Sequence, residues 1–157
     1  MNFSIELILI VVAIVLNGFF AASEFALVSC RISRLTALRT AGASLALRLK
    51  QSPDTFLATA QIGITLVGTV SSAVGGATAV DALTPLLRDL GLGAAAQPVA
   101  LGLVILALTY ISLVLGELVP KAIALRGAER YALFIARPLL ALSWLVRPLV
   151  SLLNASS

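Results

Sequence analysis

Residues 5–28 read IELILIVVAIVLNGFFAASEFALV, an apolar run typical of a helix that crosses a membrane. Its interior is interrupted at Asn17, Gly18, Ser23 and Glu24. At about 1.5 Å per residue, a helix of this length crosses a hydrocarbon core about 30 Å thick. No basic residue precedes the run, and it is too long for a cleaved signal peptide. We therefore expect a first transmembrane helix here.

The rest of the chain has the same apolar character. Of its 157 residues, 60% are hydrophobic and 11% are charged, and the mean hydropathy is +1.08. Soluble domains contain about 45–50% apolar and about 25% charged residues. A soluble fold of this size could not bury so much apolar surface, so lipid must solvate much of it. We expect one domain over residues 1–157, in a multi-pass protein of a bacterial plasma (inner) membrane.

Two further apolar segments are long enough to span. The segment over 55–80 is rich in Gly, Ser and Ala, and small residues let membrane helices pack closely. Residues 81–97 form the connection, and the third span covers 98–119. Pro120 and Lys121 are expected to end it. The predicted fold class is therefore an all-α membrane protein with three transmembrane helices.

The basic residues predict the orientation of these spans. Residues 30–50 carry five basic side chains and no acid, residues 121–157 carry five more, and the loop over 81–97 carries one. The positive-inside rule places both basic regions in the cytoplasm, with the N-terminus outside and the C-terminus inside. We expect both to form basic juxtamembrane helices, a cytoplasmic-side belt, with Pro138 and Pro148 breaking the second into short helices.

The net charge of +4 then follows from membrane topology, and we expect no nucleic-acid partner. The chain has no histidine, and Cys30 is its one cysteine. Zinc and haem sites built from these residues are thus almost excluded, and any metal must be held by oxygen. Oxygen ligands favour hard cations such as magnesium or calcium. The usual catalytic constellations are also missing, so we expect no enzyme.

Two carboxylates lie inside the predicted spans, Glu24 and Glu117. An ionisable residue within a span is costly and indicates function by default. If the two approach each other across the bundle, they provide charge for a dication. The alternative is that both lie at the interface, solvated or paired with Arg31 or Lys121.

Neutral oxygens accompany the first carboxylate. Asn17 and Glu24 share one helical face, because they are seven positions apart. Ser23 lies roughly 120° away on an ideal helix, so it joins that face only if the helix is irregular near Gly18.

The second span carries its own stripe of small and polar residues. Its members fall within roughly 80° of one another at about 100° per residue: Gln61, Thr65, Gly68, Thr69, Ser72 and Gly76. Such a stripe is either a packing surface between helices or the wall of an ion pathway. The long amide of Gln61 favours the pathway, since it suits close packing poorly.

The third span ends in a pattern that frees a backbone oxygen. Pro120 has no N–H, so the carbonyl of Gly116 loses its usual partner four residues on. Gly116 has no side chain to shield that carbonyl, and Glu117 follows directly. Broken helices with exposed carbonyls are how membrane transporters coordinate cations. The alternative is that Pro120 only terminates the span at the interface.

Three stretches together resemble one known family. They are NGFFAASEFA over 17–26, LATAQIGIT over 57–65 and GELVPK over 116–121. Their order and spacing resemble the transmembrane domain of the CorC/CNNM magnesium transporters, over nearly the whole chain. Three sets of residues fall on the family's motifs: Asn17, Ser23 and Glu24 on the first, Gln61 on the second, and Gly116, Glu117 and Pro120 on the third.

The resemblance implies a homodimer of three transmembrane helices and a juxtamembrane belt per subunit. It implies export of Mg²⁺, coupled to Na⁺ entry, and cytoplasmic CBS domains that bind nucleotide in the full-length protein. We hypothesise a dehydrating Mg²⁺ site in which Glu117 supplies charge and neutral oxygens complete the shell. The neutral ligands are Ser23 and the Gly116 carbonyl, with Asn17 or Gln61 nearby. Sodium binding or pathway lining is assigned to Glu24, Thr65, Thr69 and Ser72.

Two rival functions stay open. The first is a membrane anchor or Mg²⁺ sensor that presents cytoplasmic regulatory domains and transports nothing. The second is an intramembrane enzyme, which ranks last because the chain lacks histidine and any Asp pair within a span.

Overall fold

The computed structural model describes the backbone of residues 3–156 and the side chains of residues 6 and 8–146. This described backbone is helical almost throughout and contains no strand. In chain order the elements are α1 (Phe3–Ser29), α2 (Ile32–Ala37), α3 (Ala41–Lys50), α4 (Pro53–Leu87), the π-helical turn η1 (Arg88–Leu92), the 3-10 turn η2 (Gly93–Ala95), α5 (Ala96–Leu113), the π-helical turn η3 (Val114–Leu118), α6 (Val119–Arg126) and α7 (Ala128–Ser156).

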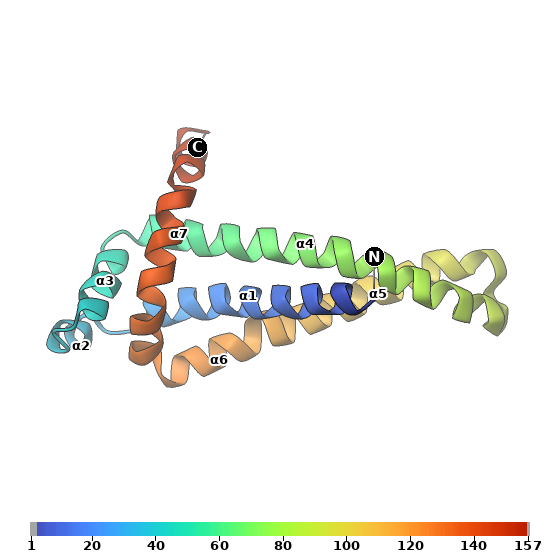
Figure 1. The fold of residues 1–157 in the computed structure, drawn as a ribbon, viewed down its shortest axis with the longest axis horizontal. Helices are drawn as coiled ribbons and strands as arrows, with labels where there is room; N and C mark the ends of the chain where they lie inside the picture. The colour runs from blue at the N-terminus through green and yellow to red at the C-terminus, as the bar shows by residue number, and fades with distance from the viewer. Residues whose placement is uncertain (1–2, 157) are drawn as a thin grey trace.

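Three long rods run side by side along the length of the molecule: α1, α4, and the continuous run of α5, η3 and α6 (Figure 1). Their outer faces are apolar and exposed, as at Val15, Leu66 and Leu106. Two stretches contain helix long and apolar enough to cross a membrane, Ile8–Ser29 and Pro53–Arg126, and the second includes the turn over 88–95 that separates α4 from α5. The prediction of an all-helical chain with membrane-spanning helices is confirmed at this level.

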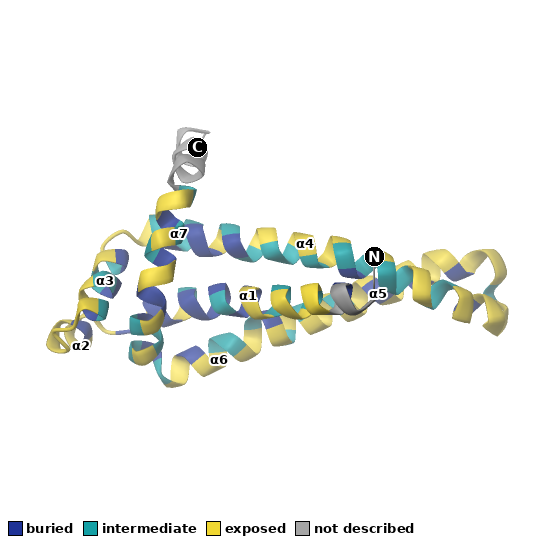
Figure 2. Ribbon diagram, in the orientation of Figure 1, coloured by how far each residue is buried: buried dark blue, intermediate teal, exposed yellow. Residues whose placement is uncertain are grey.

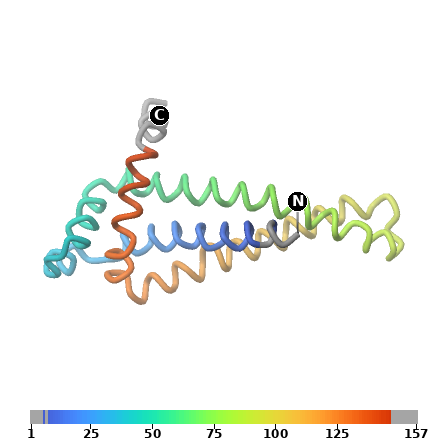
Figure 3. The backbone as a smooth tube through the Cα atoms, in the orientation of Figure 1, coloured from blue at the N-terminus to red at the C-terminus, as the bar shows by residue number. Residues whose placement is uncertain are grey.

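The hydrophobic core lies at one end of the rods. There α2 and α3 gather beside the rods and α7 runs across them (Figures 1 and 3), and dark buried segments of α7 meet the ends of α1 and α4 (Figure 2). Its largest fully buried apolar side chains are Leu27, Leu35, Phe56, Ile135 and Leu139. The rods bury little elsewhere, because lipid rather than protein covers their apolar faces. We call α2, α3 and α7 the collar.

Side-chain caps join the collar to the rods. The ammonium of Lys50 donates to the carbonyl oxygens of Leu27 (2.7 Å) and Val28 (3.1 Å) at the end of α1. Those carbonyls have no partner within α1, and a cation is the favoured group at a helix C-terminus. The Thr40 hydroxyl accepts from the Ala43 N–H at 3.2 Å and caps α3. The two bonds from Lys50 hold the end of α3 against the end of α1.

Several predicted boundaries are wrong. Helix α4 continues past position 80 to Leu87, and the connection shrinks to the turn over 88–95. This turn needs glycine, because Gly91 and Gly93 have φ of 92° and 49°. The added turns of α4 pack against α5, where Leu87, Ala96 and Ala100 form a small buried cluster with Val80 and Leu83 beside it.

The expected breaks at Pro138 and Pro148 do not occur, since α7 is one helix from Ala128 to Ser156. A proline removes one backbone hydrogen bond and strains the preceding turn. Around Pro138, the buried side chains of Ile135 and Leu139 anchor both sides of the helix in the core. Packing therefore overrides the local cost. The side chain of Pro148 lies outside the described residues.

Candidate metal site

The chain passes through Pro120 without ending the third rod. In η3 the N–H of Val119 bonds to the carbonyl of Val114, five residues back instead of four. This wider turn places Pro120 near the start of α6, where a missing N–H costs little. The expectation that Pro120 and Lys121 terminate the helix is therefore wrong. Single π turns of this kind are frequent at functional sites.

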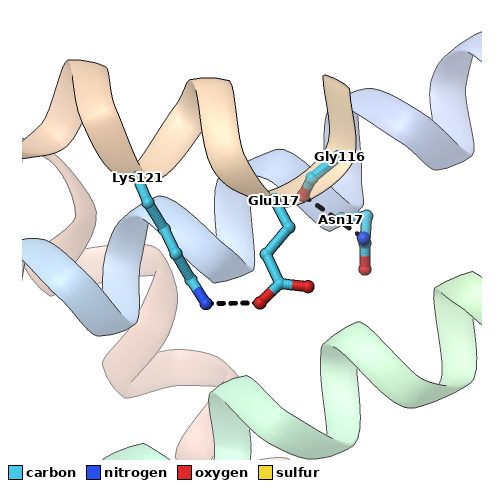
Figure 4. Close-up of polar contacts among 4 residues, drawn as sticks. All are labelled: Asn17, Gly116, Glu117 and Lys121. Atoms are coloured by element: carbon cyan, nitrogen blue, oxygen red, sulfur yellow. Dashed lines mark hydrogen bonds and ion pairs between the residues drawn. The ribbon is translucent and has the colours of Figure 1, made fainter. Parts of the chain in front are cut away.

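The Gly116 carbonyl within η3 is bonded by a side chain from another rod. The Asn17 amide nitrogen of α1 donates to this oxygen at 3.2 Å (Figure 4). The two helices approach so closely that a Cβ on Gly116 would lie 2.9 Å from that nitrogen. A Cβ on Gly18 would lie 2.8 Å from the Pro120 ring. Glycine at both positions is what permits this contact.

The other end of the same amide has no partner. Asn17 is 9% exposed, and its Oδ1 makes no hydrogen bond to any described residue. Asn17 lines a cavity of about 10 Å³, which is about the space that one water needs. The cavity lies between α1, α4 and the third rod, and its polar lining besides Asn17 and Gly116 includes Ser71 and Ser112. A buried acceptor without a donor is a place where a cation or a water belongs.

Glu117 lies next to this cavity in sequence, but its carboxylate is paired along its own helix. Lys121 donates to it across one turn (Figure 4). The ammonium also lies 5.4 Å from the centroid of the Phe25 ring of α1. The carboxylate side chain is 40% exposed, so water reaches it. The Lys121 ammonium therefore balances the negative charge of Glu117 in η3.

The other predicted ligands lie elsewhere. Ser23 is fully buried and its hydroxyl donates to the Phe19 carbonyl of its own helix. Glu24 is half-buried, and Gln61 is exposed on α4. Among the described residues no hydrogen bond joins Ser23 or Gln61 to Gly116. Thr65, Thr69 and Ser72 line a wide open groove on the outer face of α4.

The structure adds a carboxylate that sequence reasoning missed. Glu6 is 9% exposed near the far end of α1, and the Thr78 hydroxyl of α4 donates to it at 2.7 Å. The sequence offered one signal for it. Glu6 directly precedes a long apolar run, so it lies at or within the edge of the first predicted span. Neither the Asn17 cavity nor Gly116 is part of this contact.

Side-chain charge is sparse in the described part of the chain. No three His, Cys, Asp or Glu residues gather there in a metal-binding group. Burial raises the pKa of the Cys30 thiol. At η3 itself, the oxygens that could hold an ion are the Gly116 carbonyl, the Asn17 amide oxygen and the Glu117 carboxylate.

A family model described as the cyclin M transmembrane N-terminal domain matches residues 8–157. The chain belongs to this CNNM family. Similar proteins include a UPF0053 protein of Synechocystis, 46% identical over 98% of the chain, and the UPF0053 protein YhdT of Bacillus subtilis, 40% identical over 97%. An uncharacterised protein of Mycobacterium tuberculosis is 37% identical over 88%.

The CNNM chain spans about a third of the length of these relatives, 35% and 34% for the first two and 40% for the third. The family is generally linked to membrane metal transport. The matched range contains Asn17, η3 and the groove on α4, so the features described above lie inside the family domain.

Proposed function

We propose that this CNNM domain carries Mg²⁺ across a bacterial plasma membrane through a site where η3 meets α1. The observation that supports it is the buried Asn17 Oδ1, which has no partner among the described residues, on an amide whose nitrogen donates to the Gly116 carbonyl. Asn17 and Gly116 both line a water-sized cavity between the rods. Structural packing alone would favour an apolar side chain or a satisfied amide at this position.

Magnesium takes six oxygens at about 2.0–2.1 Å and gives up its waters reluctantly. In our proposal the Gly116 carbonyl and Asn17 Oδ1 supply neutral ligands, and Glu117 supplies the negative charge after leaving Lys121. Ser23 and Gln61 reach the ion only if α1 and α4 rearrange. Such rearrangement is what alternating access between the two faces of a membrane requires.

We further propose that the three rods are three transmembrane spans, with the N-terminus outside and the collar on the cytoplasmic side. The basic residues of the collar support this orientation. The working form is a homodimer that exports Mg²⁺ with Na⁺ entry and has no enzymatic activity. Glu24 and the α4 residues Thr65, Thr69 and Ser72 then bind Na⁺ or line the path. Cytoplasmic CBS domains lie in the full-length protein.

One observation favours a second function. The carboxylate of Glu117 forms an ion pair with the Lys121 ammonium one turn along the same helical run. This arrangement suits a membrane anchor or Mg²⁺ sensor, in which ion binding breaks the pair and signals to cytoplasmic domains without transport.

Calorimetric Mg²⁺ titration of the purified domain tests the site, for the wild type, Glu117→Gln and Asp89→Asn, with and without Na⁺. Glu117→Gln keeps the shape and removes the charge, so we expect its Mg²⁺ affinity to fall by at least about ten-fold, the equivalent of about 1.4 kcal/mol. Asp89→Asn removes an exposed charge at the far end and is expected to leave affinity unchanged.

Equal affinities in the two variants would refute the assignment of Glu117. Mg²⁺ flux into vesicles containing the domain then separates transport from sensing. Binding with Glu117-dependent flux supports the transporter, whereas binding without flux supports the sensor.

A further inference from the structure

A second pocket lies in the collar, away from η3. It has a volume of about 150 Å³ and is formed where the end of α3 and the start of α4 meet α7. Figure 1 shows this junction, with α7 crossing beside the first turns of α4. Binding pockets for whole drug-sized molecules are about 300–1,000 Å³. This pocket is therefore the size of a headgroup or another small polar fragment.

The lining of the pocket is suited to a phosphate. Its side chains are Arg48, Leu49, Ser52, Thr55, Leu140, Ser143 and Trp144. The guanidinium of Arg48 is a planar donor that matches phosphate oxygens. The ion pairs of the described residues are Arg34 with Glu129 and Lys121 with Glu117, so Arg48 is in neither.

Two groups at the start of α4 add to this donor. The Ser52 hydroxyl stands at the N-cap position but bonds to none of the first backbone N–H groups. The Thr55 side chain borders the same space. The start of a 35-residue helix carries partial positive charge that favours an anion, which exposed Asp54 offsets in part. The pocket thus combines a full positive charge with hydroxyl donors.

Ser143 makes the pocket suitable for a hydroxyl as well. It is 8% exposed, and its hydroxyl donates to the Leu140 carbonyl at 2.8 Å. The proton of Ser143 is therefore occupied, and its oxygen is left to accept a hydrogen bond. A ligand that carries both a phosphate and free hydroxyls satisfies both kinds of group.

The rim of the pocket is apolar on the side of α7. Leu140 and Trp144 of α7 line the pocket, and Trp144 is 74% exposed. Tryptophan is enriched at the membrane–water interface, where one part of the ring is in lipid and the N–H is in the headgroup region. A soluble anion makes no apolar contact with this rim, whereas the glycerol and the acyl chains of a lipid can pack against it.

We propose that this pocket, lined by Arg48, Ser52, Thr55, Ser143 and Trp144, binds the headgroup of an anionic, hydroxyl-bearing phospholipid such as phosphatidylglycerol. The proposal rests on the membrane placement of the collar given above, but on nothing about the Mg²⁺ site. A bound lipid at this place joins α3, α4 and α7 and anchors the collar to one leaflet.

Trp144 provides the readout, because it is the single tryptophan of the chain. The domain is placed in phosphatidylcholine nanodiscs that contain a small, increasing share of phosphatidylglycerol brominated on its acyl chains. Bromine quenches a tryptophan that it contacts. We expect more quenching than the same share of brominated phosphatidylcholine produces. Arg48→Gln should lower the affinity for phosphatidylglycerol about ten-fold, since hydrogen bonds to charged groups are the strong ones.

Arg31→Gln is the matched control, because it removes the same charge from the same basic segment outside the pocket. It should keep the wild-type affinity. Equal losses in the two variants would overturn the proposal in favour of diffuse attraction to the collar. Equal quenching by the two brominated lipids in the wild type would also overturn it.

Two further arms complete the test. Ser143→Leu fills the pocket without removing charge. Loss of the excess quenching in this variant supports a bound headgroup, whereas full retention of the quenching overturns the proposal. Soluble glycerol phosphate should leave the lipid signal intact; complete displacement would identify a soluble phosphate ligand and overturn the lipid assignment. Size-exclusion profiles confirm that each variant is folded, and Mg²⁺ titration of the same samples separates this result from the proposed transport site.

Discussion

At the scale of the residue, the two ends of the Asn17 amide have different surroundings. The nitrogen donates to the Gly116 carbonyl, whereas Oδ1 has no partner among the described residues. The residue also lines a small cavity. One amide thus joins two rods through its nitrogen, and its oxygen is left free to accept a hydrogen bond or to bind a cation. Leu16 and other apolar neighbours have no comparable group, which is why the proposed ion site is centred on Asn17.

Asn17→Ala removes the donor and leaves the Gly116 carbonyl buried and unpaired. We expect the domain to lose about 1–3 kcal/mol of stability, the usual cost of an orphaned buried polar group. Thermal unfolding in detergent measures the loss. Thr109→Ala, an exposed change on α5, is the control and should have little effect. Equal stability of the two variants would mean that water satisfies the carbonyl without cost.

At the scale of the element, glycine positions decide how closely α1 and α4 pack. A Cβ on Gly63 would lie 2.7 Å from ring atoms of Phe20, which is itself 8% exposed. On Gly75 a Cβ would lie 2.9 Å from the end of the Ile10 side chain, which can turn away. The contact at Gly63 is the more rigid of the two, because an aromatic ring in a packed site cannot give way.

Gly63→Ala should therefore destabilise the domain by about 1–3 kcal/mol through overpacking. Gly102→Ala in α5 is the matched control, because a Cβ there would meet nothing within 4 Å. It should be neutral or stabilise slightly, since alanine favours helix over glycine by up to about 1 kcal/mol. Denaturation of both variants in the same detergent compares them. A Gly63→Ala domain as stable as Gly102→Ala would show that α1 and α4 separate freely.

At the scale of the whole molecule, the packed core sits in the collar and the rods project from it with exposed apolar faces. Lipid accepts such faces, whereas the exposed Thr65, Thr69 and Ser72 give α4 a face of small side chains on which another helix can pack closely. A second copy of the chain against this face would shield them. We therefore place the proposed homodimer contact along α4, and the path proposed for Na⁺ along Thr65, Thr69 and Ser72 would then run beside this contact.

Cross-linking tests that placement. In a Cys30→Ser background, which removes the one native thiol, Thr69→Cys should form a disulfide-linked dimer when the membrane sample is oxidised. Leu106→Cys, equally exposed to lipid on α5, should remain monomeric. Gel electrophoresis without reductant reports the dimer. Cross-linking at Leu106 alone would place the contact on the third rod.

Much of this fold could be predicted from local sequence. In lipid every backbone polar group must bond within its own helix, so a long apolar run such as Ile8–Ser29 indicates a helix by itself. The freed carbonyl at Gly116 was equally local, because it follows from the missing N–H of Pro120. Local rules failed at Pro120 and Pro138, where a π turn and buried neighbours let the helix continue.

Local sequence could not predict which polar side chains from different helices contact each other. Asn17 and Gly116 are 99 positions apart, and only the packing of α1 against η3 joins them. The same packing turns Ser23 toward its own backbone and buries Glu6 against Thr78. Helix formation depends on neighbours within one turn, and the sequence shows those directly. The rotation and spacing of the rods depend on contacts between distant segments, so the tertiary structure alone settles which oxygens share a cavity.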